Sequence, residues 1–199
     1  MRDESLVKGH DVRMTTYIAL LRGVNVGGNN KVPMAVLRSA LEADGFANVR
    51  TYIQSGNVLV DATRSSTDKV AARVKAVINT AFGLDIATMV LDVAALERVA
   101  RDNPYSDESD PRRVHAIFLP GVPDADAEAR LKAMQEAVVL KGSSDTFTLI
   151  GSTLYLHTPD GFGTSDLAKA LSTKRSNEQL NGTGRNWATV TTLLEMART

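Results

Sequence analysis

Hydrophobic and polar positions follow one another along the first half of the chain in a pattern that predicts strands and helices in a definite order. The run at 16–22 is apolar at consecutive positions, as in a central strand, and Pro33 takes a favourable first helical position before apolar residues at helical spacing. A two-residue turn at Ser55-Gly56 joins two further strands. The predicted strands are 16–22, 49–54, 57–61 and 86–91, and the predicted helices are 33–45 and 65–83. This order is that of the ferredoxin-like split βαβ unit.

The second half of the chain repeats this series after a helix at 92–101. Its predicted elements are strands at 114–119, 146–150 and 153–157, helices at 125–139 and 165–171, a loop at 172–184 and a final helix capped by Asn186. We therefore predict the α+β class: two ferredoxin-like (split βαβ) halves related by duplication, plus a C-terminal helix. The predicted division is a disordered leader at 1–13, a first half at 14–102 and a second half at 103–199.

Composition excludes several classes of protein. The chain has 199 residues, of which 43% are hydrophobic, so it is long and apolar enough to form a globular core. It has no cysteine, which excludes disulfides, thiol catalysis and cysteine-ligated metals. Lysine plus arginine number 23, as do aspartate plus glutamate. This zero formal charge argues against a protein that coats nucleic acid or an anionic membrane, both of which need a basic excess.

The sequence carries no sign of export or of a membrane anchor. Residues 1–13 are polar and lack the apolar core of roughly 7–15 residues that a signal peptide needs. No apolar run approaches the roughly 18–20 residues that span a bilayer. We expect a soluble, cytoplasmic protein, either a monomer or a homodimer.

A glycine-rich loop after the first predicted strand is the first candidate site. Glycines allow a backbone turn with positive φ, and a following helix N-terminus favours anions. The loop matches neither the dinucleotide nor the nucleoside-triphosphate fingerprint, so a purely connecting loop remains the alternative. The candidate ligand-binding residues here are Arg22, Asn25, Gly27, Gly28 and Lys31.

Two more segments add polar groups. In the hairpin, the two-residue turn would pair Gln54 with Asn57 on either side of Ser55-Gly56, where amides can recognise a ligand or hold the hairpin tip. At the start of the last helix, Arg185 and Asn186 precede Trp187, the one tryptophan. Trp187 is either a stacking platform or a core residue, since its spacing matches the apolar stripe of that helix. The candidate residues from these segments are Gln54, Ser55, Asn57, Arg185 and Asn186.

Metal, cofactor and acid–base signals are weak. His115 and His157 lie on predicted neighbouring strands and could face each other across the sheet, but no third ligand is evident, so we expect no metal. Neither a cofactor motif nor a pair of carboxylates suited to proton transfer is present, and the catalytic residues are unknown.

Taken together, the motifs resemble those of the Domain of Unknown Function 1697 family, a group of mostly bacterial proteins without an established activity. The segments that carry the resemblance are RGVNVGG at 22–28, YIQSGNV at 52–58, NPY at 103–105 and RNWATV at 185–190. It runs from about Met14 to Arg198 and implies two ferredoxin-like halves, but supplies no catalytic residue.

Three functions remain open from the sequence. The first is a binding module for a small anionic ligand, a nucleotide or phosphorylated metabolite, at the three polar segments. The second is an enzyme that uses the same cluster for an unknown reaction. The third is an RNA-binding or dimerising protein; the absent RNP1 string and the 5% aromatic content argue against nucleic acid without excluding it.

Overall fold

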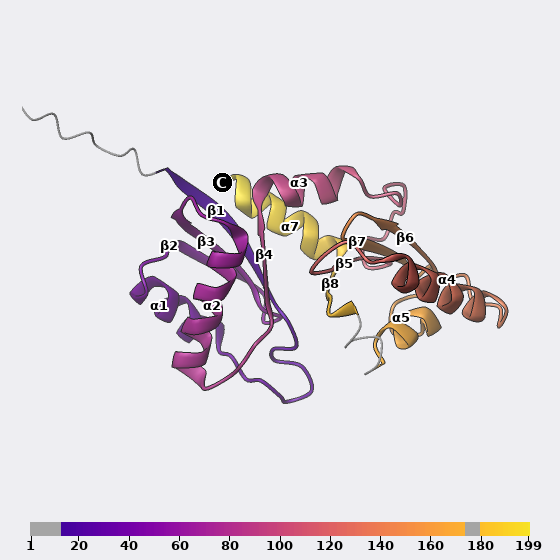
Figure 1. Cartoon of the computed structure of the whole chain (residues 1–199), viewed down its shortest axis with the longest axis horizontal. Coiled ribbons are helices and arrows are strands. Elements are labelled where there is room, and N and C mark those ends of the chain that lie inside the picture. The colour runs from indigo at the N-terminus through magenta and orange to yellow at the C-terminus, as the bar shows by residue number, and fades with distance from the viewer. Residues whose placement is uncertain (1–12, 174–179) are drawn as a thin grey trace, which may run out of the picture.

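The structure, a computed structural model, describes residues 13–173 and 180–199 and contains two four-stranded antiparallel sheets (Figure 1). The predicted leader lies outside these residues except for Arg13, whose carbonyl accepts a hydrogen bond from the Arg64 amide. The first half runs β1 (Met14–Leu21), α1 (Met34–Ala43), β2 (Ala47–Tyr52), β3 (Asn57–Thr63), α2 (Thr67–Phe82), β4 (Thr88–Asp92) and α3 (Val93–Arg101).

The second half has the same order of strands and helices. It runs β5 (Val114–Phe118), α4 (Ala125–Val139), β6 (Thr146–Ile150), β7 (Thr153–His157), α5 (Asp166–Leu171), β8 (Thr183–Asn186) and α7 (Trp187–Arg198). The sheet orders, β2-β3-β1-β4 and β6-β7-β5-β8, correspond strand for strand. These two similar halves confirm the α+β class and fit a duplicated ferredoxin-like fold with a C-terminal helix.

Individual hydrogen bonds recur at matching places in the halves. The Leu21 amide donates to the Gly56 carbonyl at 2.8 Å, and the Leu119 amide donates to the Ser152 carbonyl at 2.9 Å. The last residue of β4, Asp92, caps α3, as the last residue of β8, Asn186, caps α7. These pairs align β4 with β8 residue by residue.

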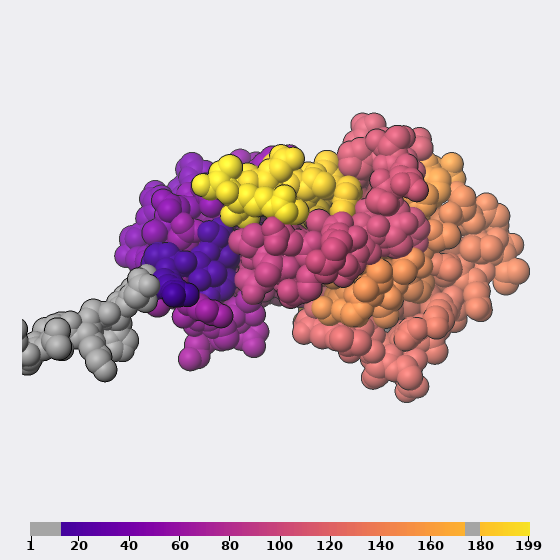
Figure 2. All heavy atoms as spheres, turned by 90° about the horizontal axis from the view of Figure 1, so that it is seen from above, coloured from indigo at the N-terminus to yellow at the C-terminus, as the bar shows by residue number. Residues whose placement is uncertain are grey.

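Three apolar clusters hold the layers together. Helices α1 and α2 cover one face of the first sheet, and α4 and α5 cover one face of the second. Between the halves, α3 and α7 lie side by side (Figure 2) and fill a third cluster with residues from both sheets. Although α7 follows the second sheet in sequence, it packs on β1 and β3 of the first, so the halves share a core. The boundary at 102/103 stays a prediction.

The strand β8 corrects the predicted loop at 172–184. Thr183 and Gly184 pair with Phe118 and Ile117 of β5, so the loop ends earlier than expected. The segment TGRN lacks apolar alternation, and its pairing depends on tertiary contact instead. A second small difference is at Pro33, which caps α1 from an extended conformation rather than beginning it.

The hairpin between β2 and β3 also differs from the prediction. Tyr52 pairs with Asn57, so the loop has four residues and Gln54 does not pair with Asn57. The Asn57 side chain explains this register, because its amide donates to the Tyr52 carbonyl at 3.2 Å and to Ser55 Oγ at 3.0 Å. The turn is closed by Gly56 at φ +76°, which packs directly against the end of β1.

Replacement of Gly56 tests this close approach. An added Cβ would lie 2.6 Å from both Leu21 Cβ and Val24 Cγ2, and the left-handed φ adds strain. We expect Gly56→Ala to lower the free energy of unfolding by about 3 kcal/mol or more in urea titrations. The control is Gly83→Ala, which has φ +68° but no atom within 4 Å of its Cβ position and should lose only about 1 kcal/mol. Equal losses would contradict the packing argument.

Candidate functional site

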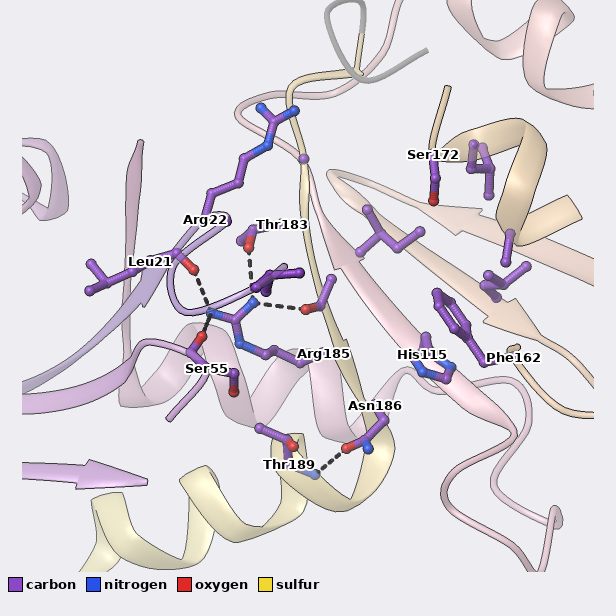
Figure 3. A pocket seen from close by; sticks show the side chains of 18 of the residues that line it. Leu21, Arg22, Ser55, His115, Phe162, Ser172, Thr183, Arg185, Asn186 and Thr189 are labelled. Atoms are coloured by element: carbon purple, nitrogen blue, oxygen red, sulfur yellow. Dashed lines mark hydrogen bonds between the residues drawn. The ribbon is translucent and has the colours of Figure 1, made fainter. Parts of the chain in front are cut away.

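A pocket of 470 Å³ opens between the two halves, beside β8 (Figure 3). The loop after β1 and the β2–β3 hairpin form one wall, and β5, β8 and α5 form the other. Most lining side chains are apolar, and the polar ones are Arg22, Ser55, His115, Ser172, Thr183, Arg185, Asn186 and Thr189. A concave, largely apolar space with a few polar groups is typical of small-molecule sites.

Two differences between the halves create this space. Helix α2 has 16 residues, whereas its counterpart α5 has 6 and so covers less of its sheet. In β4, Val90 lies two residues before the cap of α3 and is 7% exposed in the first core. The matching residue two before the cap of α7 is Gly184, which has no side chain to fill the same place. The pocket is therefore the volume that the second copy leaves unfilled.

Arg185 connects the two walls of the pocket. It is 8% exposed and projects from β8 toward the first half (Figure 3). Its Nη2 donates to the Leu21 carbonyl at 2.9 Å and to the carbonyls of Ser55 and Gly56 at 3.3 Å, and its Nε donates to Asn57 Oδ1. Its Nη1 donates within β8, to Thr183 Oγ1 at 2.9 Å and the Gly184 carbonyl at 2.8 Å. The planar guanidinium thus donates to groups on both sides of the seam, which is the contact of β8 with the end of β1 and the β2–β3 hairpin.

The charge of Arg185 has no acidic counterpart. Its acceptors are all neutral, and no Asp or Glu in the described ranges forms an ion pair with it. Burial lowers the pKa of Arg185 to about 10, so it still carries its charge at neutral pH. The corresponding residue of β4, one before the cap, is the apolar Leu91. The positive charge is thus a feature of the second copy alone.

The structure brings four of the predicted ligand-binding residues to this pocket. Arg22, Ser55, Arg185 and Asn186 line it, and Asn57 lies buried directly behind Arg185. Arg22 also contacts Asn181 Oδ1 through Nη1. The predicted hairpin and helix-start segments therefore converge with the end of β1.

The remaining predicted residues lie apart from the lining. The Asn25 side chain ties the loop together, because its amide donates to the carbonyls of Val32 at 2.9 Å and Gln54 at 2.8 Å. Gly27 and Gly28 form the tip of a tight turn closed by the Val26–Asn29 bridge, and they are exposed, as are Lys31 and the Gln54 side chain. A ligand role for Asn25, Gly27, Gly28, Lys31 and Gln54 stays a prediction.

Sequence reasoning placed His115 wrongly. Val114 pairs with His157 and His115 pairs with Leu156, so the two histidines are on opposite faces of the sheet. His157 Nε2 instead lies 2.9 Å from Glu108 Oε2, with its ring stacked on Tyr105. Within the described ranges no group of three or more His, Cys, Asp or Glu could hold a metal ion.

His115 faces the pocket. Its ring stacks on Phe162 with centroids 4.1 Å apart, and its buried Nδ1 has no hydrogen-bond partner among the described residues. Burial lowers the pKa of His115 from 6.5 to about 4, so the ring is neutral at pH 7. Phe162 also escaped prediction, whereas Ile53 and Gly184 belong to the predicted segments but were not among the candidate ligand-binding residues. The one sequence feature that could have pointed to this wall of the pocket is the polar residue His115 within the otherwise apolar strand β5.

Trp187 lies in the apolar cluster between the halves. Its side chain is half-buried and its ring centroid lies 6.3 Å from that of Tyr155, which makes it a core residue rather than a stacking platform.

Across the ranges 13–173 and 180–199, the helices are too short or too polar to cross a bilayer.

Comparison with known proteins identifies the family. Residues 14–155 match the model described as "Protein of unknown function (DUF1697)", and the chain belongs to this family, which confirms the resemblance. A conserved bacterial protein, SP0830 from Streptococcus pneumoniae, has a similar structure: TM-score 0.68 at 22% identity, covering 93% of this chain and 99% of that one. An unknown protein from Galdieria sulphuraria matches at TM-score 0.26 and 12% identity, covering 87% and 97%. No curated protein matches the chain.

Arg185 should be essential for joining the halves. We expect Arg185→Met to lower the free energy of unfolding by about 3–5 kcal/mol in urea, because it removes the hydrogen bonds that a buried guanidinium makes to groups on both sides of the seam. Arg198→Met is the control: its ion pair with Glu97, 2.9 Å long, is exposed and should contribute less than about 1 kcal/mol. A loss at Arg185 no larger than at Arg198 would show that the guanidinium does not hold the seam.

The lowered pKa of His115 predicts a loss of stability in acid. Between pH 6.5 and 4 the unfolded chain takes up a proton at this residue that the folded chain does not, so stability falls as pH falls. We expect His115→Phe to remove up to about 3 kcal/mol of this acid-dependent loss, measured by urea unfolding at pH 7 and pH 4. Parallel pH curves for the two proteins would contradict the desolvation of His115.

Proposed function

We propose that the pocket between the halves binds a small anionic ligand, with a nucleotide or a phosphorylated metabolite as the class that fits it best. The observation that supports this is the charge of the walls. Arg22 and Arg185 line the pocket, no Asp or Glu lies among its described lining residues, and His115 is neutral at pH 7. An anion would therefore meet a positive field in a partly desolvated space, although the chain as a whole has no net charge.

Polar atoms in the pocket can orient such a ligand. The Asn186 carbonyl oxygen Oδ1 caps α7, which leaves its amide nitrogen Nδ2 as a donor toward the pocket. Ser55 accepts from Asn57 through Oγ and keeps its own hydroxyl proton to donate. Arg185 uses its donors on the seam, so it contributes its field rather than a direct hydrogen bond.

A second function, an enzyme, has one specific observation in its favour. His115 lines the pocket as a neutral imidazole, the form in which histidine accepts a proton, and its buried Nδ1 has no hydrogen-bond partner among the described residues. A carboxylate to orient it is absent from the described lining, so binding is the better supported function. A cytoplasmic location and a monomeric or homodimeric state remain proposals alongside both.

Binding of AMP compared with adenosine tests the anion preference. Both carry the same base and sugar, so we expect AMP at millimolar concentration to raise the melting temperature and adenosine to raise it much less. Gly184→Val should weaken AMP binding by about tenfold or more, because the open side of Gly184 leads into the pocket and its Cβ position meets only Ile117 Cγ1, at 3.7 Å.

Gly121→Val is the matched control, since no atom lies within 4 Å of its Cβ position and it does not line this pocket. It should bind AMP as the unmodified protein does. Equal binding of AMP and adenosine, or undiminished binding by the Gly184→Val variant, would count against the proposed function.

A further inference from the structure

Ile53, in the β2–β3 hairpin, has a backbone conformation that does not suit its side chain. Its φ is +48°, in the left-handed region. The other non-glycine residues of the described chain with positive φ are all asparagines: Asn25, Asn30, Asn48 and Asn181. Asparagine tolerates this region, whereas a β-branched residue there is an outlier that loses stability. Isoleucine is therefore a poor choice for the turn itself.

The core does not account for Ile53 either. Its side chain is 52% exposed and belongs to none of the three apolar clusters of the described residues. An exposed apolar side chain in a strained turn gains little from folding. A strained, exposed residue that neither the turn nor the core requires points to a role outside the stability of the fold.

The surroundings of Ile53 indicate that role, because it lines the pocket together with two other exposed apolar side chains. Val26 is 64% exposed and comes from the loop after β1, and Phe162 is 43% exposed and comes from the segment before α5. Single exposed apolar residues are common, but here three from separate segments line one pocket and together give it an apolar border. Phe162 also stacks on His115, which makes part of this border aromatic.

We propose that Ile53 is a specificity residue that contacts the ligand, and that the ligand is an anion bearing an aromatic ring. This inference rests on the proposed function and narrows it. The ring packs on Ile53, Val26 and the Phe162–His115 stack, while the anionic group lies in the field of Arg185. An anion without a ring, such as a sugar phosphate, leaves the apolar border in water and gains only the charge interaction.

The variant Ile53→Asn separates this role from a structural one. Asparagine relieves the strain at positive φ, so we expect the melting temperature of the ligand-free protein to rise by about 2–4 °C. Val122→Asn is the matched control, because Val122 is 74% exposed, lies outside the pocket and should change the melting temperature by less than about 1 °C. A melting temperature that falls in Ile53→Asn alone would show that Ile53 serves the fold and would overturn the proposal.

Calorimetric titration with AMP and with ribose 5-phosphate completes the test. AMP carries both ring and anion, and ribose 5-phosphate carries the anion alone. We expect the unmodified protein to prefer AMP, and Ile53→Asn to weaken AMP binding by about tenfold without changing the binding of ribose 5-phosphate.

The other outcomes of these titrations separate a failure of the role of Ile53 from a failure of the proposed function. If the unmodified protein prefers AMP and Ile53→Asn binds it equally well, the role of Ile53 is wrong and the proposed function stands. If ribose 5-phosphate binds as tightly as AMP, the aromatic class is wrong. If neither probe binds the unmodified protein, the proposed function fails, and this inference fails with it.

Discussion

The arrangement of the two halves depends on the guanidinium of Arg185. All three of its nitrogens donate hydrogen bonds, and those toward the first half reach the carbonyls at the end of β1 and in the β2–β3 hairpin. The Ser55 and Gly56 carbonyls lie in the hairpin loop, outside the strand pairing, and the Gly56 carbonyl also accepts from the Leu21 amide at 2.8 Å. The α3–α7 cluster supplies apolar area between the halves, together with a buried hydrogen bond from the Tyr155 hydroxyl to the Val99 carbonyl, 3.0 Å long. Arg185 therefore fixes where the hairpin lies relative to β8, and so fixes the shape of the pocket.

The pocket arises where the second half departs from the first. Arg185 stands in place of Leu91, Gly184 in place of Val90, and the short α5 in place of the long α2. Each change on its own would destabilise a ferredoxin-like unit, since it adds a buried charge or removes core volume. Together they produce a cationic pocket next to an intact first copy. The first half thus retains a filled core and forms one wall of the pocket, while the changes in the second half open the space.

Sequence patterns predicted the elements well because the outer cores are local. Helix α2 shows its buried face through Val70, Val74 and Val77 at helical spacing, and the strands show theirs through apolar runs. The strand β8 was missed because TGRN has no such pattern and is held by pairing with β5. The hairpin register was wrong because the Asn57 side chain, rather than the turn dipeptide, sets it. Only part of the site was predicted, because Gly184 and Phe162 line the pocket only once the two halves are packed together.

The contact between the halves at Arg185, which could not be predicted from the sequence, also bears on the proposed binding, because it holds the two walls of the pocket together. Separating the halves would expose Arg185 and leave its carbonyl partners to water, so the walls cannot move apart without breaking several hydrogen bonds at once. A preformed pocket needs little ordering when a ligand enters, and the interaction energy then goes into affinity. Among the described residues that line the wall, Ile53 is the non-glycine residue with a positive φ, and it lies in the same hairpin as Gly56, which packs against the end of β1. Under the proposed function, selectivity therefore lies on a short exposed turn, whereas the charge that attracts the ligand, that of Arg185, is buried.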